Sequence, residues 1–226
     1  MTTPQPSPHP TPEAPQVAVR GEARLDVDPE IARIGVTISA RGTDRTATLT
    51  DLTRRNTLAL DLVKSYGDAV EKLETGAFSI TPEPGRHGRG ERIRAYQGRV
   101  HLIAELTDFT ALGELTTRLA DLELTRVDGP WWALRPDSPS YAAARRTAVE
   151  EAVQRARAYA EALGTSLAAL LELSDTGLVP PPAAGGMRMA FAADASDAPP
   201  PLDLEPQRQT VTAEVTARFT MAPPAL

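Results

Sequence analysis

The three histidines of the chain, at positions 9, 87 and 101, are the side chains best suited to acid–base or metal chemistry. No two of them have the short spacing that places two zinc ligands on one face of a helix. The chain has no cysteine, which excludes thiol catalysis, thiolate metal sites and disulfides. We therefore predict no metal and no cofactor, and we expect His101 to have a surface or structural role.

Serine and carboxylate residues also lack a catalytic arrangement. Ser138 and Ser140 precede an expected helix, as capping residues do, and no Gly-x-Ser-x-Gly motif is present. Glu150 and Glu151 are adjacent on a helix, so they point in different directions and do not form an acid–base couple on one substrate. The sequence predicts a protein without catalytic activity.

Arginines provide the remaining candidates for a binding site. The segment PEPGRHGRGERIR (82–94) predicts a solvated loop, with anion binding through Arg86, Arg89 and Arg92 as the alternative. It lacks the Lys-Ser or Lys-Thr that completes a phosphate-binding loop. A second hypothesis, a small-ligand or anion site (or an enzyme site) in a cleft between two subdomains, depends on three residues, namely Arg99, His101 and Arg145.

Net charge and composition exclude some partners. The 226 residues have a formal charge of -6 and only 4% are aromatic, which argues against a nucleic-acid-binding protein. No window of about 18 apolar residues occurs, so no membrane span is expected. Residues 1–16 contain six prolines and no apolar run, which predicts a disordered tail rather than an export signal, and hence a cytoplasmic protein. A ligand for a proline-recognition domain is the alternative role of this tail.

Hydrophobic periodicity places the strands and helices. Alternating apolar and polar residues predict strands at 17–27, 34–40, 71–81, 96–106, 124–134 and 210–221, with a short apolar segment at 167–173. The first two strands are expected to form a hairpin around Asp28-Pro29. Helices are expected from Thr43 or Asp44 to Tyr66, from Asp108 to Leu122 and from Tyr141 to Gly164.

The third helix carries an alanine at every fourth position, at 144, 148, 152, 156 and 160. Small side chains at this spacing form one ridge along a helix and permit close approach to a sheet. Its arginines are nearly balanced by glutamates, so we expect a packing helix rather than a nucleic-acid-binding helix. Arg145 is the one charge that falls within the apolar arc, and we expect it to lie beyond the sheet edge or to pair with a carboxylate, with a buried anion site as the alternative.

These elements predict an α+β fold, a two-layer α/β sandwich in which long helices cover one face of a mainly antiparallel sheet. We expect two α/β subdomains, one formed by 17–97 with 167–222 and the other by 98–166. Residues 179–207, rich in proline, alanine and glycine, predict a flexible insertion in the first subdomain.

Five segments follow one another over residues 17–222: VRGEARLDVDPEIARIGVTI, TGAFSITPEP, AYQGRVHLIAEL, VDGPWWALRPD with the alanine helix and LAALLELSD, and VTAEVTARF. Together they resemble the SIMPL-domain family, which includes the bacterial periplasmic immunogenic proteins. The chain departs from the pattern at Ala168-Ala169 and Arg208-Gln209, where glycines are usual. The resemblance implies action by association with a protein partner or by homo-oligomeric assembly, and it transfers no site residue.

Overall fold

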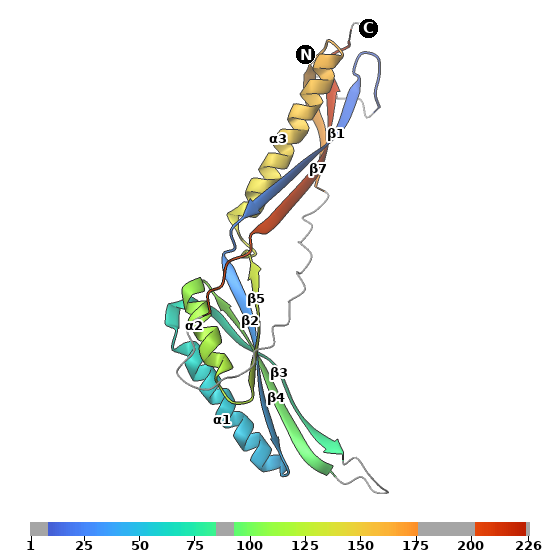
Figure 1. Ribbon diagram of the computed structural model, residues 1–226. Coiled ribbons are helices and arrows are strands. Elements are labelled where there is room, and N and C mark those ends of the chain that lie inside the picture. The colour runs from blue at the N-terminus through green and yellow to red at the C-terminus, as the bar shows by residue number, and fades with distance from the viewer. Residues whose placement is uncertain (1–8, 85–92, 176–201, 225–226) are drawn as a thin grey trace. The chain divides into compact units, whose positions relative to one another are not determined.

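The computed structural model describes residues 9–84, 93–175 and 202–224, which form two compact units (Figure 1). Unit 1 contains the described residues 9–27, 136–175 and 208–224, and unit 2 contains 28–84, 93–135 and 202–207. Each unit combines one antiparallel sheet with helices. The predicted α+β class with antiparallel sheet is therefore confirmed.

Unit 1 is a three-stranded sheet with one long helix. Its elements are β1 (Gln16–Val27), α3 (Pro139–Ala162), β6 (Leu167–Asp175) and β7 (Gln209–Met221). The strand order is β1-β7-β6, and both pairings are antiparallel. Figure 1 shows α3 running along the sheet beside β1 and β7.

Unit 2 is a four-stranded sheet with two long helices. Its elements are β2 (Ile31–Gly42), α1 (Arg45–Lys64), the 3-10 helix η1 (Gly67–Ala69), β3 (Val70–Pro84), β4 (Ile93–Leu106), α2 (Phe109–Ala120) and β5 (Thr125–Ala133). The strand order is β3-β4-β2-β5. The helix starts follow the sequence: the side chains of Asp44 and Asp108 accept hydrogen bonds from the first-turn amides of α1 and α2.

The predicted hairpin of the first two strands is wrong. β1 pairs with β7, and Val19 lies opposite Ala217, whereas β2 pairs with β4 and β5. Val27 is the last residue of β1 in unit 1 and Asp28 the first residue of unit 2. The chain therefore passes from unit 1 to unit 2 at Asp28-Pro29. The hairpin prediction failed because alternation identifies a strand but not its partner strand.

The expected subdomain boundaries also differ from the observed units. The division falls after Val27 and after Arg135, so that β2, β3, β4 and β5 share one sheet and α3 belongs with β1 and β7. The predicted partition separated the strand 96–106 from the strands with which it pairs. Long-range pairing defines the units, and the local pattern does not encode it.

Two segments predicted to be unstructured are partly ordered. Residues 1–8 lie outside the described residues, but the Pro15 carbonyl accepts a hydrogen bond of 2.8 Å from the Met221 amide, and β1 begins at Gln16. Residues 179–201 of the predicted insertion also lie outside the described residues. Leu202 packs so closely on α2 that a β-carbon at Gly113 would overlap its carbonyl oxygen, and the Leu202 amide donates to Thr117 Oγ1 at 3.2 Å. The end of the predicted insertion thus belongs to the packed part of unit 2.

The alanine helix packs as predicted. All five alanines of the ridge are buried, and they face β1 and β7. A β-carbon at Gly21 of β1 would overlap the Ala148 carbonyl oxygen, which shows how close the helix and strand lie. Arg145 is exposed, which agrees with the expected position beyond the sheet edge and not with a buried anion site. The buried strip is only as wide as the alanine column, and Arg145, about 100° around the helix from Ala144, lies beyond it.

Candidate functional site

Three leucines of β6 form the candidate site, and strand register determines their direction. Leu167, Leu170 and Leu173 lie opposite Met221, Phe219 and Ala217 of β7. Those partners are buried on the side of the sheet that faces α3, so the leucines face the same side. We call these three residues the leucine edge.

Two irregularities in β6 align the leucine edge. The register with β7 shifts between Leu167 and Ala169 and again between Leu170 and Glu172, so Ala168 and Leu171 are extra residues. A regular strand places every second residue on one face. Each β-bulge adds one residue to this interval, so leucines three positions apart share a face.

The leucine edge faces the helix side, but the helix does not cover it. Leu170 is 53% exposed and Leu173 is 48% exposed. α3 packs along β1 and β7 and barely touches β6. A helix is about 10 Å wide and strands are about 4.8 Å apart, so one helix covers about two strands. The third strand of unit 1 therefore keeps an apolar face in the open.

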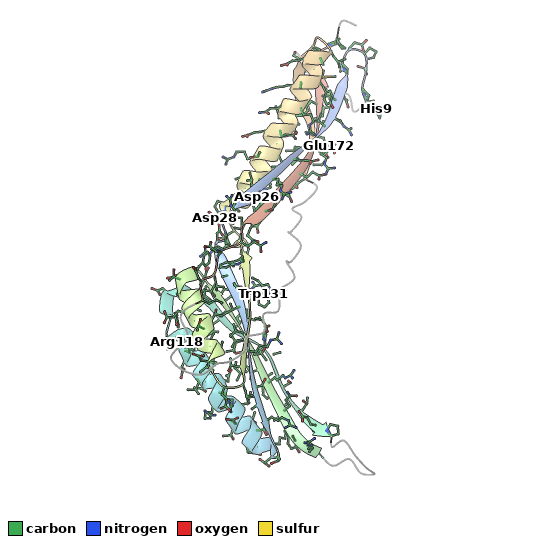
Figure 2. The ribbon with its side chains drawn as sticks, viewed as in Figure 1. His9, Asp26, Asp28, Arg118, Trp131 and Glu172 are labelled. Atoms are coloured by element: carbon green, nitrogen blue, oxygen red, sulfur yellow. The ribbon has the colours of Figure 1, made fainter. Side chains whose placement is uncertain are left out.

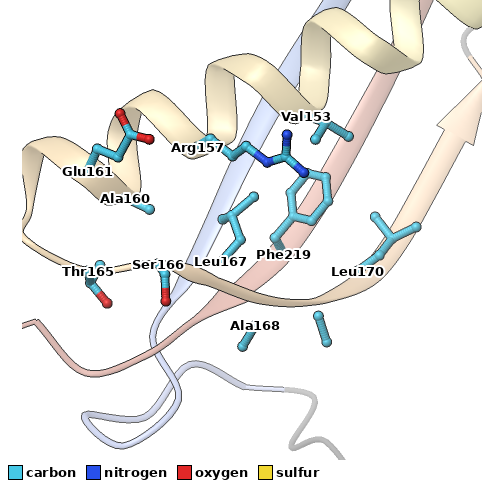
Figure 3. A pocket seen from close by; sticks show the side chains of 11 residues that line it. Val153, Arg157, Ala160, Glu161, Thr165, Ser166, Leu167, Ala168, Leu170 and Phe219 are labelled. Atoms are coloured by element: carbon cyan, nitrogen blue, oxygen red, sulfur yellow. The ribbon is translucent and has the colours of Figure 1, made fainter.

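A groove of about 400 Å³ lies between α3 and β6 (Figure 3). Its apolar lining includes Val153, Leu170 and Phe219. Figure 3 shows Arg157 and Glu161 extending from α3 beside this lining, so the groove combines an apolar surface with one cation and one anion. This composition suits contact with another molecule that is mainly apolar, and it offers no pair of carboxylates for acid–base catalysis.

His101 of β4 occupies a packed position in unit 2. Its Nδ1 lies 3.2 Å from Thr37 Oγ1 on the neighbouring strand. The imidazole passes over Gly35 of β2 and Gly76 of β3, where β-carbons would approach the ring to 2.9 Å and 3.4 Å. Trp131 of β5, which is 40% exposed, also borders Gly35 (Figure 2). His101 therefore contacts Thr37 and the two glycines on the sheet face that points away from the helices.

The other predicted binding residues are divided between the two units. Arg99 is exposed on the same strand face as His101, two residues earlier, whereas Arg145 belongs to α3 of unit 1. A ligand role for these residues stays a prediction. The anion-loop candidates Arg86, Arg89 and Arg92 lie outside the described residues.

Among the described residues, the ionisable groups with displaced pKa values belong to unit 2, whereas the leucine edge belongs to unit 1. Hydrogen bonds from Arg55 and Arg54 lower the pKa of Asp51, and a hydrogen bond from Arg135 lowers the pKa of Glu71. These are ion pairs within α1 and between neighbouring segments, with distances of 2.7 Å for Arg55 and 2.8 Å for Arg135. Displaced pKa values often mark active sites, but ion pairs that join secondary-structure elements produce them as well.

The described part of the chain has neither a metal-binding cluster nor a membrane-spanning helix. In 9–84, 93–175 and 202–224, no group of three or more histidine or acidic side chains is arranged to hold a metal ion. In the same ranges, no helix is long and apolar enough to cross a membrane.

The leucine edge could not be recognised from the sequence, because the features that define it are not local. The apolar segment 167–173 is visible in the sequence, but a three-residue spacing is not the period of a regular strand. The bulges and the position of α3 are both tertiary features. The only sign of this edge in the sequence was the spacing of leucines at every third position, together with an acidic residue that follows them.

Comparisons with known proteins agree on one family. A family model described as "SIMPL: Protein of unknown function (DUF541)" matches residues 17–219. The "26 kDa periplasmic immunogenic protein" of Brucella melitensis biotype 1 is 24% identical over 188 residues, which cover 79% of this chain and 74% of the relative. The protein of the same name from Brucella abortus (strain S19) has the same identity and coverage.

A solved structure, described as a putative amidohydrolase/peptidase from Burkholderia cenocepacia, is also similar to part of the chain. The match has 17% identity and a TM-score of 0.24, and it covers 59% of this chain and 33% of that one. A TM-score this low supports no inference about fold or function.

Proposed function

Since the chain belongs to the SIMPL family, which is described only as a family of unknown function, we propose that it is not an enzyme and that it acts by protein association, including homo-oligomeric assembly. The proposed activity is physical, namely that another polypeptide covers an exposed strand edge of this chain.

The leucine edge is the observation that carries this proposal. Burial of a leucine side chain stabilises by about 1.5–3 kcal/mol, so covering the exposed halves of Leu170 and Leu173 would contribute about 2 kcal/mol. Edge strands with exposed apolar residues are ready sites for pairing with another chain. The contacts of His101 with Thr37, Gly35 and Gly76 support the non-enzymatic part, because they favour a packing role for this histidine.

Measurement of solution mass by light scattering tests the proposal. We expect the full chain to be heavier than a monomer, and we expect Leu170→Arg to shift the mass to the monomer by placing a charge in the covered surface. Leu58→Arg is the matched control, because Leu58 of α1 is also about half exposed, at 49%. A wild-type chain that stays monomeric at all concentrations and binds no protein contradicts the proposal.

Binding of a small molecule is the second candidate function, and the groove between α3 and β6 favours it. The 400 Å³ volume, its apolar lining and Arg157 suit an apolar compound with an anionic group. In a thermal-shift screen of aliphatic carboxylates, a ligand at about 100 times its dissociation constant should stabilise by about 2.7 kcal/mol. The shift should fall in Arg157→Gln. If no carboxylate shifts the melting temperature, this candidate is eliminated.

The proposal includes a cytoplasmic location. The lack of cysteine supports it, because a chain without disulfides gains nothing from an oxidising compartment. The two Brucella relatives are named periplasmic, which makes location a point to test directly. In cell fractionation we expect the full chain to follow a cytoplasmic marker enzyme, and recovery with a periplasmic marker would contradict this part.

A further inference from the structure

The sheet face of unit 2 that points away from α1 and α2 carries two aromatic rings side by side. Trp131 of β5 is 40% exposed, and His101 of β4 is partly exposed (Figure 2). Both rings border Gly35 of β2, where a β-carbon would lie 2.9 Å from His101 Cε1 and 3.5 Å from Trp131 Cη2. The indole and the imidazole are therefore neighbours across three strands, and we call these two residues the ring platform.

Glycines keep the ring platform close to the sheet. A β-carbon at Gly76 of β3 would lie 3.4 Å from His101 Cδ2, and one at Gly129 of β5 would lie 3.3 Å from Trp131 Cε3. Side chains at Gly35, Gly76 and Gly129 would occupy the space that the two rings fill. The surface is therefore shallow, and its exposed indole is available for contact with another molecule.

The charges beside the ring platform are balanced. Strand register places Asp128 opposite Gly35 and Glu105 opposite Arg33, on the same face as the rings. Among the described residues, three ion pairs lie on this face around the rings: Arg126 with Asp128 at 2.5 Å, Arg33 with Glu105 at 2.5 Å, and Lys72 with Glu74 at 3.0 Å. Paired charges of this kind attract neither an anion nor a cation strongly.

We infer that the ring platform binds a neutral oligosaccharide, with sugar rings stacked on Trp131 and His101. The face of an aromatic ring is negative, so it attracts the weakly positive C–H groups on the face of a sugar ring. Sugar hydroxyls need donors and acceptors at the edge of the stack, and Arg126 and Asp128 supply both. The inference goes beyond the proposed function and does not depend on the leucine edge, which belongs to unit 1.

The surroundings of the ring platform disfavour other ligands that stack on aromatic rings. A cationic ligand would meet Arg126, and Arg99 lies on the same face two residues from His101. A nucleic acid needs cations for its phosphates, whereas Arg126, Arg33 and Lys72 each have a carboxylate partner. A neutral polyol needs no free charge, because paired carboxylates and guanidinium groups still form charge-assisted hydrogen bonds with hydroxyls.

The length of the ring platform sets the size of the ligand. Trp131 and His101 are on strands separated by β2, and neighbouring strands are about 4.8 Å apart, so the platform extends over roughly 10 Å. This length exceeds one sugar ring, and we expect at least two linked units to bind. Because a shallow site contacts only one face of the sugar, we expect a dissociation constant of roughly 10 μM to 1 mM.

Isothermal titration calorimetry of the full chain with oligosaccharides tests the inference. The neutral probes are cellohexaose, chitohexaose and maltohexaose, and a hexamer of galacturonic acid is the anionic comparison. We expect at least one neutral probe to bind, and we expect the anionic hexamer to bind about tenfold more weakly or not at all, because Asp128 lies beside the rings.

Variants locate the site on the ring platform. Trp131→Ala should weaken binding of the neutral probe by about tenfold or more through the loss of stacking. Phe78→Ala is the matched control, because Phe78 is also an exposed aromatic residue, at 56%, but lies opposite Val100 on the helix side of the sheet. Asp128→Ala keeps both rings and should weaken binding by about tenfold through lost hydrogen bonds. Circular dichroism melting checks that each variant is folded.

Three results would overturn the inference. They are a wild-type chain that binds none of the neutral probes, an anionic hexamer that binds more tightly than every neutral probe, and a neutral probe whose affinity is unchanged in both Trp131→Ala and Asp128→Ala. The proposed function is tested separately, since Leu170→Arg should change the solution mass and leave sugar affinity unchanged. Failure of sugar binding therefore leaves the proposed function standing, and a monomeric chain leaves this inference standing.

Discussion

Both units of this protein pack helix against sheet, but they do so with different side chains. In unit 2, α1 packs on β2 and β4 and α2 packs on β5 and β2, and the ten largest fully buried side chains are all in this unit. In unit 1, one helix with an alanine face lies against β1 and β7, and β6 is left uncovered. Large residues between a sheet and two helices give unit 2 a thick core, whereas close backbone approach gives unit 1 a thin one.

The comparison extends to the uncovered strands. Phe78 of β3 is 56% exposed and, like Leu170 of β6, lies opposite a buried residue of the neighbouring strand. β3 surrounds its aromatic residue with charges and prolines, whereas β6 carries a row of leucines. The difference shows that exposure alone does not identify a contact surface; the neighbouring residues decide whether an edge is protected or available.

The largest expected effect is on the thick core of unit 2. Leu115→Ala removes a fully buried side chain of α2 and should lower the free energy of unfolding by about 3 kcal/mol. Leu170→Ala in unit 1, at half exposure, should cost less than about 1 kcal/mol at a concentration where the chain is monomeric. Both tryptophans are in β5, so urea unfolding followed by tryptophan fluorescence measures the loss in unit 2, and urea unfolding followed by circular dichroism, which reports both units, measures the loss in Leu170→Ala. Equal losses in the two variants would remove the distinction between the cores.

The next effect is on the close approach in unit 1. Gly21→Ala places a methyl group against the backbone of α3 near Ala148, and we expect a loss of about 2 kcal/mol because the helix must move away. Urea unfolding followed by circular dichroism measures this loss. Ala18→Gly, at an exposed position of the same strand, controls for the change between glycine and alanine. An unchanged midpoint for Gly21→Ala would mean that the alanine ridge does not depend on close contact.

The smallest effect is electrostatic and belongs to unit 2. Arg55 and Arg54 lower the pKa of Asp51 in the folded chain, so Asp51 contributes stability above its ordinary pKa of about 4 and loses it as the pH falls through the lower folded value. Because partly exposed ion pairs are worth at most about 1 kcal/mol, Asp51→Asn should cost less than that at pH 7.

The test of the Asp51 pair is a pH series. The difference in unfolding free energy between the wild type and Asp51→Asn should disappear at a pH below the folded pKa of Asp51. The same pH series on Glu22→Gln, which removes a carboxylate at an exposed position in unit 1, provides the comparison. A difference that persists at low pH would show that the substitution acts through packing instead of charge.

Much of the fold was predictable because it depends on local patterns. The strand alternation in 210–221 and 96–106 matches the buried residues of β7 and β4, and the caps at Asp44 and Asp108 start α1 and α2. The sequence did not predict that β1 pairs with β7 and not with β2, because β7 and β2 both have a suitable apolar face. The surroundings of Arg145 stayed open because helical periodicity gives the direction of a side chain but not the width of the surface that covers it.

The candidate site, like the fold, was predictable from the sequence only in part. The sequence by itself determined the strands, the helices, the alanine ridge and the apolar character of 167–173, since each follows from residue type and spacing along a few turns or pleats. Only the tertiary structure decided that bulges align Leu167, Leu170 and Leu173 and that α3 stops short of β6. The physical reason is that exposure of a residue depends on which distant element lies over it, and the spacing of strands and helices sets that relation across the whole sheet.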